Sequence, residues 1–439
     1  MFTPPAGLPD QLEILVADMN GIPRGKLIQG RSIANGSLPH LALSHFFQTI
    51  TGGYADLIDV HNPKDEDMLL MPEWETYRRT PWKENNCGQV ICRTMTKRGE
   101  PITYDPRNCL RTILAAYEER GWRPIIAPEV EFFLVEPISD ADLPLVPATG
   151  EQGRVESGGE SFSVDALESY SEFIATLNQV STDADIRFHG LAHEMAPAQM
   201  ELNVHHGEAL SRADELFMLK RLVKACAVQH EMVASFMAKP MEDHPGSGLH
   251  LHVSIFDQDD NNILALNGGE AGEGLLHFIG GLQEYLPQAF ALMAPTVNSF
   301  KRFQPELAAP FNLEWGYDNR TAGLRVPYDD DRNGRVENRI AGADANPYLF
   351  IATTLACGLL GLERKVLPRA PLESSAYDLE PTFPMDMYSA LRRLDACDEI
   401  KSLLGKNLVD IYIDVKRTEL AHFDAEIHPW ERRFLADAL

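Results

Sequence analysis

Three short segments of the sequence each carry two charged or imidazole side chains that are separated by a single residue. They are Glu129/Glu131 in APEVEFFL, His250/His252 in GLHLHVS and Glu337/Arg339 in RVENRI. Because successive side chains of a β-strand point to opposite faces, the two members of each pair would share one face. Apolar neighbours would pack the other face. Strands of this kind line a wet cavity rather than a dry core.

A fourth segment, AHEMAPAQMELN, adds the carboxylates of Glu194 and Glu201. Pro197 lies between them and disfavours a continuous helix, so a turn must relate the two side chains. Any single pair alone is more often a solvated strand face. If all four segments converge, however, two carboxylates at about 4 Å repel by roughly 1 kcal/mol in water and roughly 4 kcal/mol near a protein surface. Such a cluster requires cations, and carboxylates with few imidazoles favour Mg²⁺ or Mn²⁺ over Zn²⁺.

The segment KRFQPELAAPFNLEWGYDNRTAGLR, residues 301–325, concentrates guanidinium groups around a Pro-interrupted, Ala-rich middle. Arg302, Arg320 and Arg325 carry permanent charge and a planar fork of donors, which suits bidentate binding of carboxylate or phosphate. One such arginine alone is more often part of a surface ion pair. Together with a metal-binding set upstream, the segment instead predicts a site for carboxylate and phosphate groups.

The composition restricts the classes of partner. The chain has 439 residues and a formal net charge of −26, from 65 acidic and 39 basic side chains. Nucleic acids and membrane surfaces are disfavoured because both are bound largely through Lys and Arg. The six cysteines form no CxxC pair and are expected to be buried thiols in a reducing cytoplasm. The sequence opens without a leader pattern, and its longest apolar segment, residues 350–362, is shorter than the ~20 residues that span a bilayer.

The elements that must position these side chains alternate irregularly along the chain. Strands are expected at residues 12–21 (into an Asn-Gly turn), 24–30, 89–95, 123–137 and 246–257, and helices at residues 106–122, 207–238, 269–292, 346–366 and from 385 to the end. A polar, turn-rich stretch predicts a boundary near residue 100, which separates a domain of residues 1–100 from one of residues 101–439. Strands and helices without a regular βαβ rhythm favour the α+β class.

These segments, taken in order, resemble those of glutamine synthetase over nearly the whole chain. The resemblance runs from ADMNGIPRGK and DEDMLLMPE through APEVEFFL, AHEMAPAQMEL and AKPMEDHPGSGLHLHVS to NSFKRFQPELAAP, DNRTAGLRVP and RVENRIAGADANPYLFIA. It implies an N-terminal β-grasp domain followed by a catalytic domain with a curved antiparallel sheet and helices. It also implies a homo-oligomer, a hexameric ring or a dodecamer, in which neighbouring subunits share each active site.

The resemblance also implies roles for individual residues. The positions that match ligands of a first divalent ion are Glu131, Glu194 and Glu201, and those that match ligands of a second ion, which holds the nucleotide phosphates, are Glu129, His250 and Glu337. Contacts to ATP are implied for His206, His252, Ser254, Arg325 and Arg335. Contacts to a glutamate substrate are implied for Arg302, Arg339 and Gly246, and contact to the transferred phosphate for Arg320.

The implied chemistry has two steps and uses ATP with two or more Mg²⁺ or Mn²⁺ ions per site. The γ-carboxylate of L-glutamate attacks the terminal phosphorus of ATP, which gives γ-glutamyl phosphate and ADP. An amine then displaces phosphate and leaves an amide. Metal ions and arginines would neutralise the charge on the transferring group.

One departure from the family bears on the amine. Ala308 stands where glutamine synthetases that use ammonia have a glutamate, which closes over the site and takes a proton from ammonium. Losing a positioned base typically costs about 10²–10⁴ in rate. Losing the side chain also opens room for an alkyl group. The sequence therefore predicts a γ-glutamyl-amine ligase, with polyamines such as putrescine as leading substrates, as in the γ-glutamylpolyamine synthetase branch of the family.

Four further residues bear on this prediction. Asp18, in ADMNG, matches an ammonium-pocket aspartate usually supplied by the neighbouring subunit, and it is the expected residue for binding and deprotonating the amine. Glu306 is a second acid on the Ala308 loop. Pro245 replaces a usual asparagine, and this substitution affects the expected contact to the amino group of glutamate. Tyr377 lies where some family members are adenylylated.

Two alternatives stay open. If another acid replaces the lost glutamate, the chain is an ammonia-using glutamine synthetase. If the active site is inactive, the chain is a non-catalytic structural or regulatory assembly. Against this alternative, a suitable residue is present at every metal-binding and phosphate-binding position. The sequence does not choose among amines or between hexamer and dodecamer.

Overall fold

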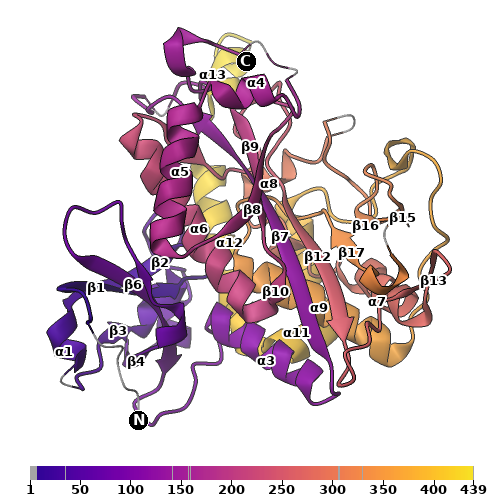
Figure 1. Ribbon diagram of the computed structural model, residues 1–439, viewed down its shortest axis with the longest axis horizontal. Coiled ribbons are helices and arrows are strands. Elements are labelled where there is room, and N and C mark those ends of the chain that lie inside the picture. Colours follow the sequence, from indigo (N-terminus) through magenta and orange to yellow (C-terminus); the bar gives the residue numbers. More distant parts are fainter. Residues whose placement is uncertain are drawn as a thin grey trace.

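The computed structural model describes residues 7–34, 36–140, 142–156, 158, 160–304, 307–328 and 330–438. Two separate β-sheets and the helices packed around the second of them make up the described fold (Figure 1). The α+β class predicted from the sequence is confirmed. All six cysteines are unpaired and buried. Among the described residues, the structure contains no helix whose length and apolar character would allow it to cross a membrane.

The first sheet lies at the lower left of Figure 1 and has the strand order β2-β1-β6-β4-β3, with β5 on β6. Its elements are β1 (Gln11–Ala17), β2 (Pro23–Gln29), α1 (Gly30–Ala34), β3 (His40–Ala42), α2 (Ile58–His61), β4 (Asp67–Pro72), β5 (Arg78–Arg79) and β6 (Cys87–Met95). β1 and β2 form the predicted antiparallel hairpin, with Ala17 opposite Pro23. Gly21 takes φ of 72° in the turn, a conformation that glycine adopts without strain.

The second sheet is larger and has the strand order β15-β16-β17-β12-β7-β9-β8, with β10 and β11 also paired to β7. Its strands are β7 (Arg123–Val135), β8 (Phe188–His193), β9 (Gln199–Val204), β10 (Gly207–Glu208), β11 (Val233–Ser235), β12 (Leu249–Phe256), β15 (Trp315–Tyr317), β16 (Leu324–Val326) and β17 (Val336–Asn338). All pairs are antiparallel except β15 with β16. A separate small hairpin joins β13 (Leu266–Asn267) to β14 (Glu270–Ala271).

The helices surround this sheet and bury its apolar side chains. They are α3 (Pro106–Glu118), α4 (Val164–Glu168), α5 (Ser171–Ala184), α6 (Ala209–Gln229), α7 (Glu273–Tyr285), α8 (Val297–Phe300), α9 (Pro347–Arg364), α10 (Met387–Ala396), α11 (Asp398–Leu404), α12 (Lys406–Ala425) and α13 (Pro429–Leu435). Helix α9 is buried from Pro347 to Gly361 and contacts α3, α6, α7 and α11. Helices α3 and α6 pack against β7, so β7 has a helical side and a free side.

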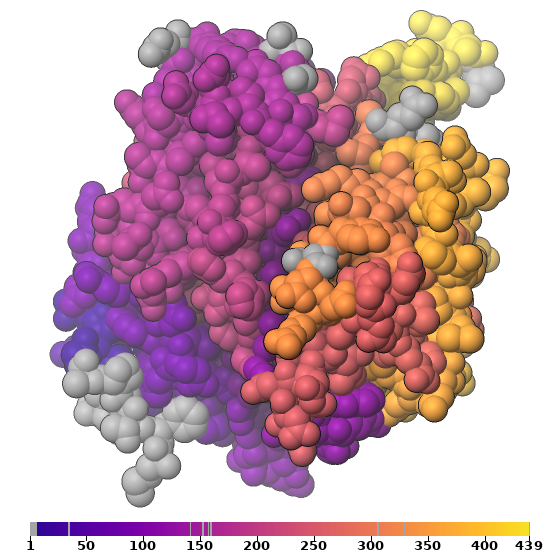
Figure 2. Space-filling model, turned by 45° about the vertical axis from the view of Figure 1, so that its right-hand side comes forward, coloured from indigo at the N-terminus to yellow at the C-terminus, as the bar shows by residue number. Residues whose placement is uncertain are grey.

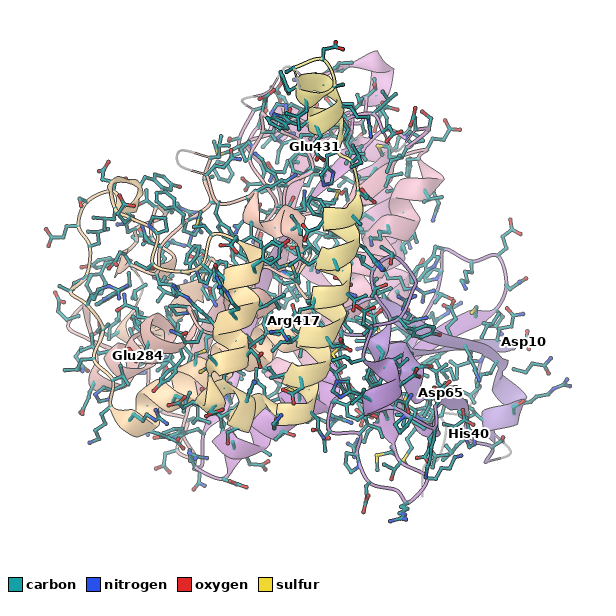
Figure 3. The ribbon with its side chains drawn as sticks, turned by 180° about the vertical axis from the view of Figure 1, so that it is seen from behind. Asp10, His40, Asp65, Glu284, Arg417 and Glu431 are labelled. Carbon is teal, nitrogen blue, oxygen red and sulfur yellow. The ribbon has the colours of Figure 1, made fainter. Side chains whose placement is uncertain are left out.

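The last long helix ties the two ends of the chain together. Figure 3 shows α12, with Arg417, along the back of the molecule beside the first sheet, and α13, with Glu431, at the top. Glu419 on α12 accepts hydrogen bonds from the backbone N of Ile50 (2.7 Å) and from Asn20 Nδ2 (3.0 Å). The N-terminal domain is thereby held against the C-terminal helices.

A buried ion-pair network also joins the first sheet to helices that pack around the second sheet. The guanidinium of Arg107, at the start of α3, lies 2.6 Å from Glu73 and donates two 2.7 Å hydrogen bonds to Asp214 on α6. The Tyr348 hydroxyl of α9 donates to the same aspartate at 2.9 Å. Arg93 of β6 pairs with Glu73 at 2.8 Å. Elements of the first sheet and three helices therefore depend on one cluster of charges.

We expect replacement of Glu73 by alanine to destabilise the protein. Breaking a buried ion pair on one side typically costs about 3–5 kcal/mol, because the remaining charge stays in a poorly solvating environment. The thermal midpoint of Glu73→Ala should fall by several degrees in a calorimetric scan. Glu75→Ala is the matched control, because Glu75 is exposed two residues away. Equal midpoints for the two variants would show that the network contributes nothing.

Candidate active site

The strand register of the second sheet sets most of the predicted metal ligands side by side. The directly opposed pairs are Glu131 with Glu201, Glu129 with His250, and Glu337 with His252. Directly opposed residues of an antiparallel pair have Cβ atoms about 4.5–5.5 Å apart. The array therefore crosses four adjacent strands, β9, β7, β12 and β17.

Side-chain alternation along β7 follows the predicted period of two. Val130 and Phe132 are fully buried in the main core, whereas Glu129 and Glu131 are only partly buried. In Figure 2, a groove separates the magenta and orange parts of the surface, and purple atoms from earlier in the chain are visible at its floor. The carboxylates thus project from the side of β7 that the helices leave free.

Distances between side chains show that the pairs converge. Nε2 of His252 lies 3.1 Å from Glu129, and Nδ1 of His250 lies 3.6 Å from Glu129 and 3.6 Å from Glu337. Two groups have ligand atoms that all lie within 4.8 Å of one another: Glu129, Glu201 and His250, and Glu129, His252 and Glu337. Glu129 belongs to both groups. His252, expected at ATP, also joins the second group.

The pKa values of these carboxyl groups indicate how much negative charge the site concentrates. Burial, together with the charges of Glu129, Glu131 and Glu194, raises the pKa of Glu201 to about 9. Burial and Glu131 together raise the pKa of Glu194 to about 7. Protons therefore compensate charge that a divalent cation would otherwise compensate.

The donor set fits hard divalent ions. Five carboxylates and one or two imidazoles offer the oxygen-rich environment that Mg²⁺ and Mn²⁺ prefer. Nδ1 of His252 is buried and has no hydrogen-bond partner within the described part of the chain. Although burial acts to raise the pKa of Glu337, Arg339 and the two imidazoles lower it to about 2, so this carboxylate remains available as a ligand.

Glu194 reaches the site from a turn rather than from a strand. Its backbone N donates to Gln199 O at 2.8 Å, which closes the turn between β8 and β9 that Pro197 predicted. Gln199 Nε2 lies 3.3 Å from Glu131, and its Oε1 accepts from Ala196 N at 3.1 Å. The side chain of Gln199 therefore links the turn to Glu131 on β7.

Two buried arginines lie at the edge of the carboxylate array. Arg302 donates to Ile340 O at 2.8 Å, and Arg339 donates to Glu337 at 2.7 Å. The Nε atoms of both arginines are buried and lack hydrogen-bond partners among the described residues. Any side chain at Gly246 would place its Cβ 2.1 Å from Ala238 O and 2.8 Å from Arg302 Cγ. Unsatisfied donors beside a loop that only glycine fits suit a carboxylate ligand such as glutamate.

The guanidinium of Arg325 contacts the second group of candidate metal ligands through Glu337. Its Nη1 donates to Glu337 at 2.7 Å, and its Nη2 donates to Asp318 at 2.7 Å. Ser254, on the face of β12 that carries His252, donates to Gly334 O at 3.0 Å, next to Arg335 in sequence. These residues, expected at the nucleotide, border one end of the array.

Arg320 and His206 are both exposed. Arg320 interacts electrostatically with Glu194 and lowers its pKa. Within the described residues, its guanidinium makes no hydrogen bond, so its donors remain available to an anion. His206 follows β9 directly, two residues beyond the end of the strand. The strand that carries Glu201 thus leads to the side chain expected at adenine.

Ala308 is exposed and has φ of 62°, a left-handed conformation that is uncommon for residues other than glycine. The next residue, Ala309, is buried and donates its backbone N to Leu307 O at 2.8 Å. Glu306, the second acid expected on this loop, lies outside the described residues. The structure therefore describes an alanine methyl group at this position and solvent around it.

Asp18 takes a local role in this chain. Its carboxylate is completely buried and accepts hydrogen bonds from Asn20 N (2.9 Å), Ile22 N (2.9 Å) and Arg24 Nε (2.8 Å). It closes the turn between β1 and β2. An amine could reach this carboxylate only if Arg24 moved away.

Tyr377 lies near the buried arginines, and this was not expected from the sequence. Its ring stacks on Phe311, with centroids 5.9 Å apart and an interplanar angle of 16°. Burial raises the pKa of the phenol, and the charges of Arg339 and Arg302 oppose that shift. The backbone N of Ala376, beside it, donates to Thr321 Oγ1 at 2.8 Å. The phenol thus borders the expected glutamate subsite.

Sequence reasoning missed a buried pair behind Glu194. His193 and Glu156 are almost completely buried, and their side chains lie 3.0 Å apart. The adjacency of His193 to Glu194 was a visible signal. Glu156 gave none, because it lies in an irregular loop 37 residues earlier in the chain.

Comparisons with known proteins agree with this geometry. A family model described as the catalytic domain of glutamine synthetase matches residues 103–435. Among solved structures, apo GmaS without ligand superposes with a TM-score of 0.83 at 29% identity, covering 98% of this chain and 97% of that one.

Three relatives are similar over most of their length. Gamma-glutamylputrescine synthetase PuuA of Escherichia coli is 32% identical over 419 residues, which cover 94% of this chain and 89% of that protein. Glutamine synthetase of Halobacterium salinarum is 30% identical, with coverage of 91% and 90%. Glutamate–isopropylamine ligase of a Pseudomonas species is 31% identical, with coverage of 83% and 80%.

The raised pKa values predict how divalent ions affect stability at different pH. Glu201 has a pKa of about 9 in the folded chain and 4.5 as an ordinary glutamate. The stability that its proton contributes is therefore fully present below pH 4.5 and is lost as pH rises through 9. A divalent ion replaces the proton, so the increase in thermal midpoint caused by Mn²⁺ should grow between pH 6 and pH 9.

The measurement is a thermal scan at each pH with EDTA or with Mn²⁺. Glu201→Gln is the control, because the amide cannot titrate and its midpoint in EDTA should vary less over this range. A stabilisation by Mn²⁺ that is independent of pH would contradict the assignment.

Proposed function

The chain belongs to the glutamine synthetase family, and from this membership we propose that it is an ATP-dependent ligase that joins the γ-carboxylate of L-glutamate to an amine larger than ammonia. The observation that carries the proposal is Ala308. The residues for phosphoryl transfer are all present, yet the position that removes a proton from ammonium holds a methyl group. A protein that used ammonia would depend on that acid.

The first step uses the residues of the second sheet. Arg302 and Arg339 would bind the substrate glutamate, and their buried Nε donors, which have no acceptor among the described residues, support this role. Arg320, exposed and near Glu194, would face the phosphoryl group as it passes from ATP to the γ-carboxylate. Nucleotide contacts would come from His206, His252, Ser254, Arg325 and Arg335.

The site would hold two or more divalent ions, Mg²⁺ or Mn²⁺. The first would be held by Glu131, Glu194 and Glu201, and the second by Glu129, His250 and Glu337. Such ions supply charge neutralisation at the phosphate oxygens. The protein residues hold the reacting groups in line and limit access of water.

The amine step must start from a protonated nucleophile. An alkylamine resembles the Lys side chain, with a pKa near 10.4, so its deprotonation at pH 7 costs roughly 4–5 kcal/mol. Because alanine at position 308 cannot accept it, the proton must be transferred to another group. Asp18 of a neighbouring subunit is the expected acceptor, provided that Arg24 releases it.

The surroundings of Ala308 support an alkyl group. Phe311 lies three residues further along the same segment, and Tyr377 stacks on it beside Arg302 and Arg339. Phe311 is buried and Tyr377 is only partly buried, so the alkyl part of an amine would pack on the ring of Tyr377, while ammonium would gain nothing from it. The names of two relatives state amines larger than ammonia, putrescine and isopropylamine, and we place polyamines such as putrescine first.

An ammonia-using glutamine synthetase is the second candidate function. The Halobacterium relative has this name and is nearly as similar to the chain as the amine ligases are. A non-catalytic assembly is a weaker alternative, because the metal-binding and arginine residues are all retained.

The family also leads us to propose a homo-oligomer, a hexameric ring or dodecamer, with active sites shared between subunits. Large apolar side chains of the N-terminal domain support such contacts, because Ile50, Leu57 and Val60 are at least half exposed. The unpaired, buried cysteines support a reducing compartment such as the cytoplasm.

A panel of amines tests the proposed function. The purified protein with glutamate, ATP and Mg²⁺ should release phosphate fastest with putrescine, spermidine, ethanolamine or ethylamine, and at least about tenfold more slowly with ammonium. Mass spectrometry of the amide product identifies the preferred amine. Glu337→Ala is the control that should be inactive with every amine. If ammonium is the best substrate, the chain is a glutamine synthetase.

Restoring the acid at position 308 should shift the preference. Ala308→Glu supplies a base, so its kcat/KM for ammonium should exceed that of Ala308→Gln by at least about tenfold. The two side chains have the same size and the same strain at φ of 62°, so only the carboxylate differs. Both should slow the reaction of larger amines. Identical ammonium kinetics for the two variants would mean that position 308 does not control proton removal.

A further inference from the structure

A buried side-chain pair lies directly behind the turn that carries Glu194. The Nε2 atom of His193 lies 3.2 Å and 3.0 Å from the two carboxylate oxygens of Glu156. The exposed fractions of the two side chains are 0% and 1%. The Tyr170 hydroxyl also interacts with Glu156. These residues face away from solvent, so surface solubility does not explain their charges.

The pair contacts both ends of the turn. Nδ1 of His193 lies 2.9 Å from the backbone O of Glu194, at the start of the turn. Glu156 accepts a 2.9 Å hydrogen bond from the backbone N of Ala198, near its end. The turn is therefore spanned by one imidazole–carboxylate unit anchored in another loop.

The backbone of the turn needs such an anchor. Ala198 has φ of 56°, a left-handed conformation that is unfavourable for a residue with a Cβ atom. Its N–H points to Glu156 rather than to a strand partner, and Ala198 is completely buried. Without Glu156, a strained residue would also carry an unsatisfied buried donor.

The geometry of this turn decides where two expected metal ligands lie. Glu194 begins it, and Glu201 follows two residues after its end at Gln199. Gln199 in turn contacts Glu131, the third expected ligand of the same ion. A shift of the turn would move Glu194 relative to the other two carboxylates.

We propose that Glu156 and His193 are positioning residues that hold the turn of residues 194–199 in the conformation that binds the first divalent ion. The inference rests on the proposed metal sites but is independent of which amine is used. Neither residue touches a substrate or a metal ion. Both act through the backbone of Glu194 and Ala198.

Metal binding by the full-length protein tests this proposal without any turnover. Removing a group that orients a metal ligand typically weakens metal affinity by about 10–100-fold. Titration of Mn²⁺ by calorimetry, in the absence of nucleotide, should show a loss of this size for Glu156→Ala. Glu156→Gln keeps an acceptor for Ala198 N and should recover most of the affinity. Glu160→Ala is the matched control, because Glu160 lies in the same loop and, among the described residues, its carboxylate forms an ion pair only with Arg154, at 2.5 Å.

A second set of variants separates positioning from general destabilisation. Glycine adopts positive φ without strain, so Ala198→Gly added to Glu156→Ala should restore part of the lost affinity. A folded Glu156→Ala protein with the Mn²⁺ affinity of the wild type would overturn the proposal, and so would equal losses in Glu156→Ala and Glu160→Ala.

If Glu156→Ala is insoluble, two variants of His193 replace it. His193→Asn and His193→Gln each remove one of the two contacts of the imidazole. Each should weaken Mn²⁺ binding at least fivefold, about the lower part of the same range. Unchanged binding in both would also overturn it.

Because the readout is metal binding, its outcome is separate from that of the amine panel. A protein that prefers ammonium can still depend on Glu156 for Mn²⁺, and an amine ligase can bind Mn²⁺ without it.

Discussion

Repulsion between carboxylates on one face of the second sheet is the constraint on which the site depends. The ladder of β9, β7, β12 and β17 puts Glu201 opposite Glu131 and His250 opposite Glu129, and these pairings cannot relax without breaking strand hydrogen bonds. The resulting negative charge is partly neutralised by the imidazoles, by the arginines that pair with Glu337, and by protons on Glu201 and Glu194. A divalent ion at these residues would add further compensation, on side chains that the strand pairing already positions.

The sequence predicted local features of this site well and long-range ones only through the family resemblance. A period of two was enough to put Glu129 and Glu131 on one face, and Pro197 was enough to predict a turn. Convergence depends on strand pairing between residues far apart, such as His252 and Glu337, which no local pattern encodes. Asp18 illustrates the converse, because a matching motif does not reveal that the carboxylate closes its own turn and is buried.

The two halves of the proposed reaction draw on different kinds of structure. Phosphoryl transfer would use side chains fixed on strands, where a substitution disturbs neighbours on both sides. The amine would contact the loops that carry Ala308 and Tyr377. A substitution in these loops leaves the strand pairing of the second sheet unchanged. A family built this way can change its nucleophile while it keeps the strands of the site. This fits the similar identity, 30–32%, that the chain shares with a glutamine synthetase, a gamma-glutamylputrescine synthetase and a glutamate–isopropylamine ligase.

Glu194 is the exception within the metal set, and the exception accounts for the buried pair behind it. Glu131 and Glu201 are held by hydrogen bonds of the sheet on both sides of each residue, so they need no further support. Glu194 lies beyond the last pairing of β8, on a turn with a left-handed alanine, where the backbone has several accessible conformations. A ligand on such a turn stays in place only if the turn has its own anchor. His193 and Glu156 contact the two ends of the turn, and Glu156 does so from an irregular loop that no strand pattern in the sequence marks.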